Sequence, residues 1–181
     1  MSTRKALFLD RDGVINHDKG YTSRIEDFFF IDGIFDLCRA AIHSGYLLVV
    51  VTNQAGIGRG YYSETDFLSL TEWMCTRFKD EGILISDVLF CPYHPEHGVG
   101  SYKRHSPDRK PSPGMLLKAL KKHDLDMANS IMVGDKESDM QAASKAGVGT
   151  RCKYLDTCSP DTDVSISTHN VGSLREVINL L

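Results

Sequence analysis

Short, continuously apolar runs alternate with amphipathic helical patterns along the chain, and this alternation is the feature that most restricts its fold. The clearest run is YLLVVV at residues 46–51, in which every side chain is apolar or aromatic. A run without a polar face is typical of a strand that is covered on both sides. Since parallel neighbours need crossover connections, which are usually helices, the alternation predicts an α/β domain with a helix-covered parallel sheet.

The strands and helices can be placed from these patterns. We expect strands at residues 5–9, 46–51, 85–90, 130–133 and 149–155, with a short edge strand at 163–167. Helices are expected at 34–44, about 63–81, 114–123, 138–147 and 173–181. Asp32 is expected to cap the first helix, while Ser63 and Asp66 resemble a capping box for the second. The length of 181 residues predicts a single domain over residues 1–181.

Charge and composition exclude several classes of protein. The net charge of −3 gives no support to a nucleic-acid partner, which usually requires a basic face. No apolar run is long enough to span a bilayer, and the first residues lack the form of a signal peptide. The cysteines are scattered, odd in number and mostly set in apolar patterns. We therefore expect a reduced, cytoplasmic protein without membrane partners, and we expect it to be a monomer.

Polar and charged residues follow four of the expected strands. In chain order they are Asp10 and Asp12, Thr52 and Asn53, Arg109 and Lys110, and Asp135 with Lys136 and Asp139. Because ligands of open parallel sheets bind beyond the carboxyl ends of the strands, we expect these side chains to share one site. Carboxylates suit a magnesium ion, while lysines, hydroxyls and backbone amides suit phosphoryl oxygens. The sequence therefore predicts a site for magnesium and a phosphate group.

Each of these fragments has an ordinary structural explanation when it is taken alone. Asp-Gly is common in turns, and Pro113 could simply begin a helix. The functional interpretation depends on all four fragments occurring in order, each after an expected strand.

The order of these fragments resembles the motifs of the haloacid dehalogenase superfamily of phosphotransferases. DRDG at 10–13 is similar to its first motif, Thr52 to its second, Lys110 to its third and GDKESD at 134–139 to its fourth. Longer stretches, including FLDRDGVIN, VVVTNQAGIGRG, RKPSPGML and MVGDKESDMQAA, resemble the small D-glycero-D-manno-heptose 1,7-bisphosphate 7-phosphatases. This resemblance covers nearly the whole chain and implies a three-layer, Rossmann-like fold of the capless type.

The resemblance implies a magnesium-dependent phosphatase that removes the 7-phosphate from D-glycero-D-manno-heptose 1,7-bisphosphate, in nucleotide-activated heptose biosynthesis. Asp10 would attack phosphorus and form an aspartyl-phosphate, and Asp12 would serve as general acid and base. Thr52 and Lys110 would stabilise the transferred phosphoryl group. Magnesium would be held by Asp10, Asp135 and the backbone carbonyl of Asp12.

Substrate contacts also carry over from the family to matching positions. They are Asp18, Lys19, Gly20, Tyr21, Thr52, Asn53, Gln54, Ala55, Arg109 and Lys110. Arg109 is our candidate for the second, non-reacting phosphate, because a guanidinium group suits bidentate phosphate contact. Lys136 is expected to pair with Asp10 or to lie near the metal, and Asp139 to support the site or cap its helix.

The chain departs from the family at the zinc site expected in the connection between residues 91 and 113. Cys91 matches a ligand, but Tyr93, Ser106 and Asp108 stand at the other three ligand positions. We therefore expect a connection without zinc, held by its prolines and by packing. A rearranged zinc site is the alternative, and its ligands would be Cys91, His94, His97 and His105.

Three other functions share parts of this pattern. A histidinol-phosphate phosphatase has the same layout of motifs, so it is the alternative enzyme. A non-enzymatic phospho-receiver domain would also hold magnesium and a phosphorylated aspartate, but it would carry an acidic pair before that strand. Asp12, two residues after Asp10, therefore favours turnover over signalling, and the intact set of motifs argues against a non-catalytic binding module.

Overall fold

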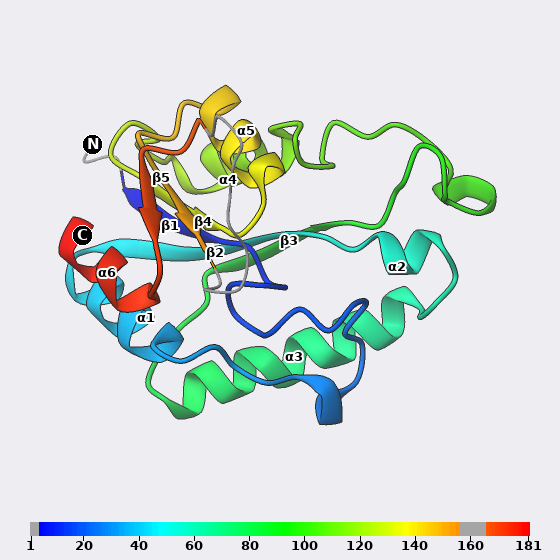
Figure 1. Ribbon diagram of the computed structural model, residues 1–181, viewed down its shortest axis with the longest axis horizontal. Coiled ribbons are helices and arrows are strands. Elements are labelled where there is room, and N and C mark those ends of the chain that lie inside the picture. The colour runs from blue at the N-terminus through cyan, green and yellow to red at the C-terminus, as the bar shows by residue number, and fades with distance from the viewer. Residues whose placement is uncertain (1–3, 156–165) are drawn as a thin grey trace.

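The computed structural model describes residues 4–155 and 166–181, in which six parallel strands form one sheet (Figure 1). The strands are β1 (Lys5–Leu9), β2 (Tyr46–Asn53), β3 (Asp87–Cys91), β4 (Ile131–Gly134), β5 (Thr150–Tyr154) and β6 (His169–Val171). Their order across the sheet is β3-β2-β1-β4-β5-β6, and every neighbouring pair is parallel. The predicted parallel α/β fold is confirmed.

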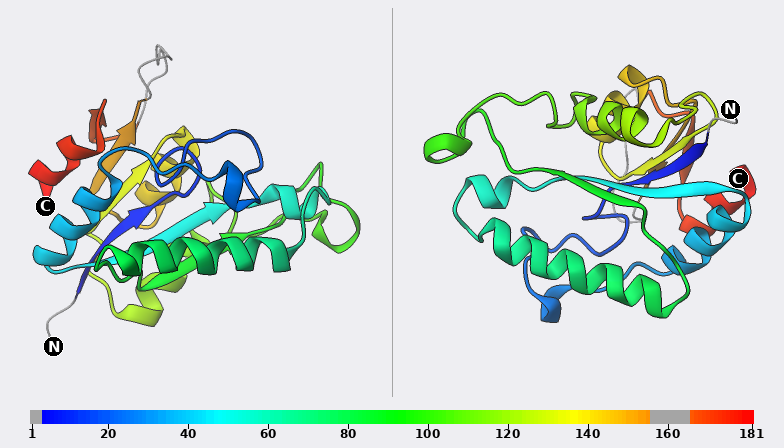
Figure 2. Two further views of the ribbon diagram at one scale, coloured as in Figure 1. Left: turned by 90° about the horizontal axis from the view of Figure 1, so that it is seen from below. Right: turned by 180° about the vertical axis from the view of Figure 1, so that it is seen from behind.

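Helices cover both faces of this sheet, giving three layers (Figures 1 and 2). The helices are α1 (Ile34–His43), α2 (Ala55–Gly58), α3 (Glu64–Asp80), α4 (Gly114–His123), α5 (Glu137–Lys145) and α6 (Leu174–Val177). Leu7 and Leu9 of β1 pack in the core shared with α1, α3 and α6. Ala6 and Phe8 pack in the core shared with α4 and α5. Both faces of β1 are therefore buried, which is why every residue of the strand after Lys5 is apolar.

The N-termini of α1 and α3 are built differently. The Ser63 hydroxyl accepts a hydrogen bond from the Asp66 N–H at 3.1 Å, and Asp66 accepts one from the Ser63 N–H at 2.8 Å, so the predicted capping box is confirmed. The prediction for Asp32 was wrong, because Gly33 is the N-cap of α1. Gly33 has a φ of 85°, and this left-handed turn leaves Asp32 outside the cap, 3.5 Å from Arg175.

The C-terminal elements also differ from the prediction. Residues 163–165 of the expected edge strand lie outside the described part, and 166–167 are not in a strand. The edge strand is β6, where Val171 enters the core and fixes the pairing with β5. The expected helix at 173–181 is a single α-helical turn, α6, followed by a 3₁₀ turn at Ile178–Leu180. In residues 4–155 and 166–181, no helix has the length and apolar character needed to cross a membrane.

Candidate active site

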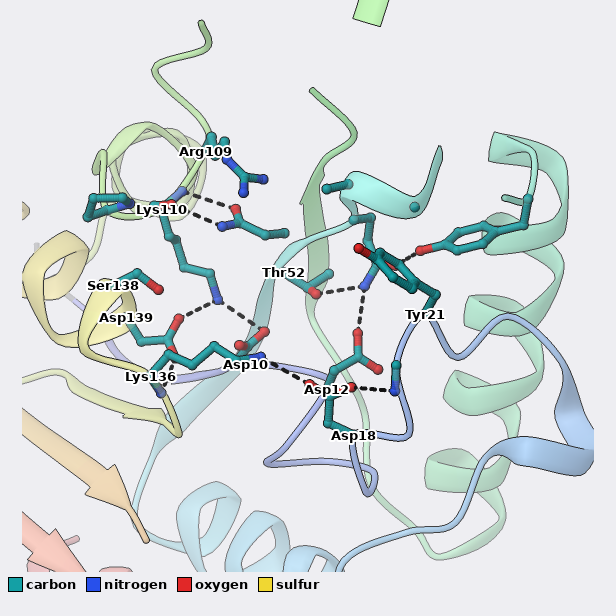
Figure 3. A pocket seen from close by; sticks show the side chains of 17 residues that line it. Asp10, Asp12, Asp18, Tyr21, Thr52, Arg109, Lys110, Lys136, Ser138 and Asp139 are labelled. Atoms are coloured by element: carbon teal, nitrogen blue, oxygen red, sulfur yellow. Dashed lines mark hydrogen bonds and ion pairs between the residues drawn. The ribbon is translucent and has the colours of Figure 1, made fainter. Parts of the chain in front are cut away.

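The carboxyl ends of β1 and β2 and the segment before α4 surround a cavity of about 610 Å³ (Figure 3). All four predicted catalytic residues line it: Asp10, Asp12, Thr52 and Lys110. The predicted substrate residues in its wall are Asp18, Gly20, Tyr21, Thr52, Asn53, Gln54, Ala55, Arg109 and Lys110. Lys19 is outside this wall, because it is exposed and its Nζ lies 3.8 Å from the centre of the Phe29 ring.

Lys110 is the buried cation at the floor of the cavity. Its Nζ lies 3.0 Å from Asp10 Oδ1 and 2.7 Å from Asp139 Oδ1, and it donates to the Val51 carbonyl at 2.8 Å. Burial alone would lower the pKa of Lys110, but the carboxylates of Asp10 and Asp139 outweigh it and raise that pKa above its ordinary value. The ammonium group is therefore charged and uses all three of its hydrogens.

Asn53, at the end of β2, fixes the backbone of Lys110. Its side-chain oxygen accepts from the Lys110 N–H, and its amide nitrogen donates to the Lys110 carbonyl, both at 3.0 Å. This pair of bonds joins the segment before α4 to the sheet, which explains how a residue so far from β2 in sequence reaches the strand ends.

Asp10 follows β1 and is almost completely buried, with 6% of its surface exposed. Its Oδ1 accepts from the Arg11 N–H at 2.7 Å and also contacts Lys110. Burial, with a smaller contribution from neighbouring carboxylates, raises the pKa of Asp10 to about 7 despite the opposing charge of Lys110. Asp10 is thus a carboxyl group in a strongly negative, desolvated environment.

Asp10, Asp135 and Asp139 each offer one carboxylate oxygen, and these oxygens lie within 4.8 Å of one another. Burial also raises the pKa of Asp135 to about 6, and its Oδ1 is buried without a hydrogen-bond partner among the described residues. Gly13 permits this arrangement, because a Cβ there would lie 2.3 Å from Asp135 Oδ2. Unsatisfied oxygen ligands in a negative site fit Mg²⁺, which prefers carboxylates.

Asp139 is not one of the predicted metal ligands, although its carboxylate lies in this group. Its Oδ1 pairs with Lys110 and its Oδ2 accepts from the Lys136 N–H at 3.0 Å, at the start of α5. Asp139 therefore both supports Lys110 and caps its own helix, which are the two roles left open from the sequence.

Asp12 lies on the opposite side of the cavity and is held by several donors. Arg11 Nη2 donates to both of its oxygens at 2.8 Å, and the side-chain amides of Asn16 and Gln54 each donate at 3.0 Å. Arg11 is buried, with 1% of its surface exposed. We did not predict a role for Arg11; the sequence signal was an arginine placed between two acids directly after a buried strand.

Gln54 connects Asp12 to Thr52. The same Gln54 Nε2 that donates to Asp12 donates to Thr52 Oγ1 at 2.8 Å, while the Tyr62 hydroxyl donates to Gln54 Oε1 at 2.5 Å. Burial raises the pKa of Tyr62 to about 12, so it acts as a donor. Tyr62 was missed, because nothing in the sequence indicates that it reaches back eight positions to Gln54.

Two further cations lie at the edge of the cavity. Lys136 Nζ pairs with Asp18 Oδ2 at 3.1 Å and lies 3.6 Å from Asp135 Oδ2, so it stands beside the acidic group instead of pairing with Asp10. Arg109 is half-buried and donates to the Tyr93 carbonyl at 3.3 Å. In the described part of the chain no carboxylate lies within ion-pair distance of Arg109, so its charge faces the cavity uncompensated.

The four residues of the alternative zinc site are not gathered as ligands. Within the described residues, the one group of three or more potential metal ligands is Asp10, Asp135 and Asp139. His94 Nδ1 instead accepts from the backbone N–H groups of Glu96 and His97, at 3.2 and 3.0 Å.

The chain is similar in sequence to known proteins. A family model described as "HAD-hyrolase-like" matches residues 108–152. The chain is 63% identical over 152 residues to the D-glycero-alpha-D-manno-heptose-1,7-bisphosphate 7-phosphatase of Burkholderia mallei, covering 84% of this chain and 80% of that protein. It is 49% identical over 180 residues to the D-glycero-beta-D-manno-heptose-1,7-bisphosphate 7-phosphatase of Vibrio cholerae, covering 98% and 96%.

Solved structures share the fold. A HAD-like protein from Mesorhizobium loti superimposes with a TM-score of 0.86 at 34% identity, covering 98% of this chain and 85% of that one. The D,D-heptose 1,7-bisphosphate phosphatase of B. bronchiseptica, solved with magnesium and phosphate, gives a TM-score of 0.80 at 24% identity, covering 97% of both chains.

Proposed function

Since this chain belongs to the D-glycero-D-manno-heptose-1,7-bisphosphate 7-phosphatase family of the haloacid dehalogenase superfamily, we propose that it removes the 7-phosphate from that bisphosphate. The observation that most directly supports this proposal is one cavity lined by Asp10, Asp12, Thr52 and Lys110. The group of carboxylates formed by Asp10, Asp135 and Asp139 lies beside it. The enzyme is then a phosphoric monoester hydrolase of nucleotide-activated heptose biosynthesis. We infer a cytoplasmic monomer that works as one domain over residues 1–181.

In the first step, Asp10 attacks phosphorus and the bond to the sugar oxygen breaks. The Arg11 amide and the Lys110 ammonium both contact Oδ1 of Asp10, so Oδ2 is the oxygen directed at the substrate. An aspartyl-phosphate forms on Asp10, and protonated Asp12 gives its proton to the leaving sugar oxygen. Lys110 and the Thr52 hydroxyl stabilise the charge on the transferred phosphoryl oxygens.

In the second step, water attacks phosphorus of the aspartyl-phosphate and Asp12 accepts a proton from that water, while the bond from phosphorus to Asp10 breaks and inorganic phosphate leaves. Arg11 contacts both oxygens of Asp12 and so holds this carboxyl group in place for the step. Gln54 orients the same carboxylate relative to Thr52, so the base and the phosphoryl-binding hydroxyl keep a fixed separation.

Asp10 and Asp135, with the Asp12 carbonyl that the family resemblance implies, would hold Mg²⁺, which supplies positive charge between the carboxylate and the phosphate dianion. The proximity of Asp10, Asp135 and Asp139 supports this assignment.

Phosphate release from a panel of substrates tests the function. We expect the highest kcat/KM with a D-glycero-D-manno-heptose 1,7-bisphosphate, assayed as both anomers, and a product that keeps its 1-phosphate by ³¹P NMR. Activity should disappear with EDTA and return with Mg²⁺. A higher kcat/KM with histidinol phosphate would transfer the assignment to the alternative enzyme.

Arg109→Ala should impair a bisphosphate more than a monophosphate. Arg109 faces the cavity next to Lys110 without an acidic partner among the described residues, which suits it to bind the second phosphate. Loss of a charge-assisted contact costs about 1.5–3 kcal/mol, or about a tenfold to hundredfold loss of kcat/KM. The measurement is the ratio of kcat/KM for the heptose bisphosphate to that for an aryl phosphate. An equal loss on both substrates would assign Arg109 to the reacting phosphate or to the fold.

We also propose that the enzyme needs no zinc. Three of the four usual ligand positions carry Tyr93, Ser106 and Asp108, and His94 makes backbone contacts within its own turn. Elemental analysis of the purified protein should give less than about 0.1 zinc per chain, since a structural zinc site needs four ligands. One zinc per chain that is lost in a Cys91→Ser variant would contradict this.

A further inference from the structure

The segment from residue 92 to residue 113 carries Arg109 and Lys110 but has little regular structure of its own. Its single regular element is a 3₁₀ turn at Gly100–Tyr102, and the segment extends beyond the end of the sheet (Figure 2). Asn53 fixes the segment at Lys110, next to the sheet. The position of the Arg109 guanidinium therefore depends on what holds the outer part of the segment.

A chain of side-chain contacts connects that outer part to helix α3. The Tyr102 hydroxyl donates to Glu64 Oε1 at 2.9 Å, and Glu64 is the first residue of α3. The centres of the Tyr93 and Tyr102 rings lie 5.9 Å apart, and the Arg104 guanidinium lies 3.8 Å from the centre of the Tyr93 ring. We call Tyr93, Tyr102 and Glu64 the tyrosine cluster. Its far end contacts the active site, because the Tyr93 carbonyl accepts from Arg109 Nη1 at 3.3 Å.

Backbone contacts hold the tyrosine cluster against α2. The His94 N–H donates to the Tyr102 carbonyl at 3.1 Å, and the Val99 N–H donates to the Gly58 carbonyl at 2.7 Å. A Cβ at Gly58 would lie 2.4 Å from the Pro92 carbonyl oxygen and 3.3 Å from Tyr102 Cβ. The segment is thus packed closely on α2 and bonded to α3, so a change at Tyr102 can reach Arg109 through Tyr93.

We propose that Tyr93 and Tyr102, anchored by Glu64, are positioning residues that hold Arg109 for the second phosphate of the substrate. This inference rests on the proposed function, and it identifies the residues that make the enzyme prefer a substrate with a second phosphate. The contact with the Tyr93 carbonyl uses one of the five N–H groups of Arg109 and leaves the others for phosphate. Without the tyrosine cluster, the guanidinium would have more freedom and would bind the second phosphate less well.

Tyr102→Phe tests the proposal, because it removes the hydroxyl and keeps the ring. We expect KM for the heptose bisphosphate to rise about threefold to tenfold with kcat unchanged, as for loss of part of one polar contact. The kcat/KM for an aryl phosphate should change by less than about twofold. Glu64→Ala should match Tyr102→Phe, and Glu64→Gln should retain wild-type KM, since its amide oxygen still accepts. Tyr46→Phe, at the start of β2 and far from the segment, is the control.

The same variants in an Arg109→Ala background decide whether the tyrosine cluster acts through Arg109. There, Tyr102→Phe should cause no further change in KM. A full additional effect, or an equal loss on both substrates, would overturn the proposal. So would a stoichiometric zinc whose removal reproduces the rise in KM, since the metal would then hold the segment.

Amide hydrogen exchange separates a failure of this proposal from a failure of the proposed function. Without any substrate, the His94 and Val99 amides should exchange faster in Tyr102→Phe than in wild type, because the first bonds to the Tyr102 carbonyl and the second joins the same segment to Gly58 of α2. Unchanged exchange would overturn the tyrosine cluster even in an active phosphatase. Wild-type protein without activity on the bisphosphate would overturn the proposed function, while the exchange result would still decide the role of the cluster in holding the segment.

Discussion

Asp10→Asn is expected to lower phosphate release by about a thousandfold or more while the protein stays folded, because an amide cannot attack phosphorus. The substitution keeps the shape of the side chain, and Lys110 retains its contacts with Asp139 and the Val51 carbonyl. The measurement is kcat with an aryl phosphate at saturating Mg²⁺, with far-UV circular dichroism to establish folding. Asp36→Asn is the matched control, since Asp36 is an exposed aspartate on α1. Activity near the wild-type level in Asp10→Asn would exclude Asp10 as nucleophile.

The same variant has an expected pH signature in EDTA. In the folded wild type the pKa of Asp10 is about 7, compared with 3.8 for the ordinary group, because the side chain is buried among carboxylates. Between these values the unfolded chain releases a proton that the folded chain keeps, so this group lowers wild-type stability as pH rises. Asparagine does not titrate. The stability of Asp10→Asn relative to wild type should therefore increase from pH 5 to pH 7 in urea unfolding, and a decrease would contradict the raised pKa.

The sequence was most informative where one physical constraint dominated. The runs at 6–9 and 46–51 are packed on both faces, so their continuous apolar pattern identified β1 and β2 directly. Parallel pairing then brings the carboxyl ends of β1, β2 and β4 to one edge, which is why the amino-acid pattern alone predicted that Asp10, Thr52 and Asp135 lie together. The capping box at Ser63 is similarly local, because it needs only two side chains three residues apart.

Individual contacts between side chains of the site could not be predicted in this way, whether the two residues are neighbours or far apart in sequence. The Arg11–Asp12 pair, the Tyr62–Gln54 bond and the contact of Lys110 with Asp139 depend on how loops close around the cavity. The strand β6 was not predicted, for a related reason. β6 pairs on one side only, so few contacts fix its register, and the alternating pattern at 163–167 competed with the three residues that form the strand.

Lys110→Met is expected to have the largest effect on stability, with activity lost as well. Lys110 has 2% of its surface exposed and lies between the buried carboxylates of Asp10 and Asp139. Removal of one partner from a buried charged group leaves uncompensated charge and costs about 3–5 kcal/mol in the free energy of unfolding. Urea unfolding at pH 7.5 in EDTA measures this loss. Lys136→Met is the matched control, because the Lys136 side chain is 54% exposed and its pairs with Asp18 and Asp135 should contribute less than about 1 kcal/mol.

Acid should partly restore the stability of Lys110→Met. Without the ammonium group, nothing opposes the burial that already raises the pKa of Asp10 to about 7, so Asp10 takes up a proton readily as pH falls. A protonated carboxyl group needs no buried counterion, and the stability deficit relative to wild type should shrink from pH 7.5 to pH 5.5. Adding Asp10→Asn to Lys110→Met should recover part of the deficit at pH 7.5 for the same reason. A deficit that is independent of pH and unaffected by Asp10→Asn would mean that Lys110 stabilises the fold through packing and its bond to Val51, not through the charge of Asp10.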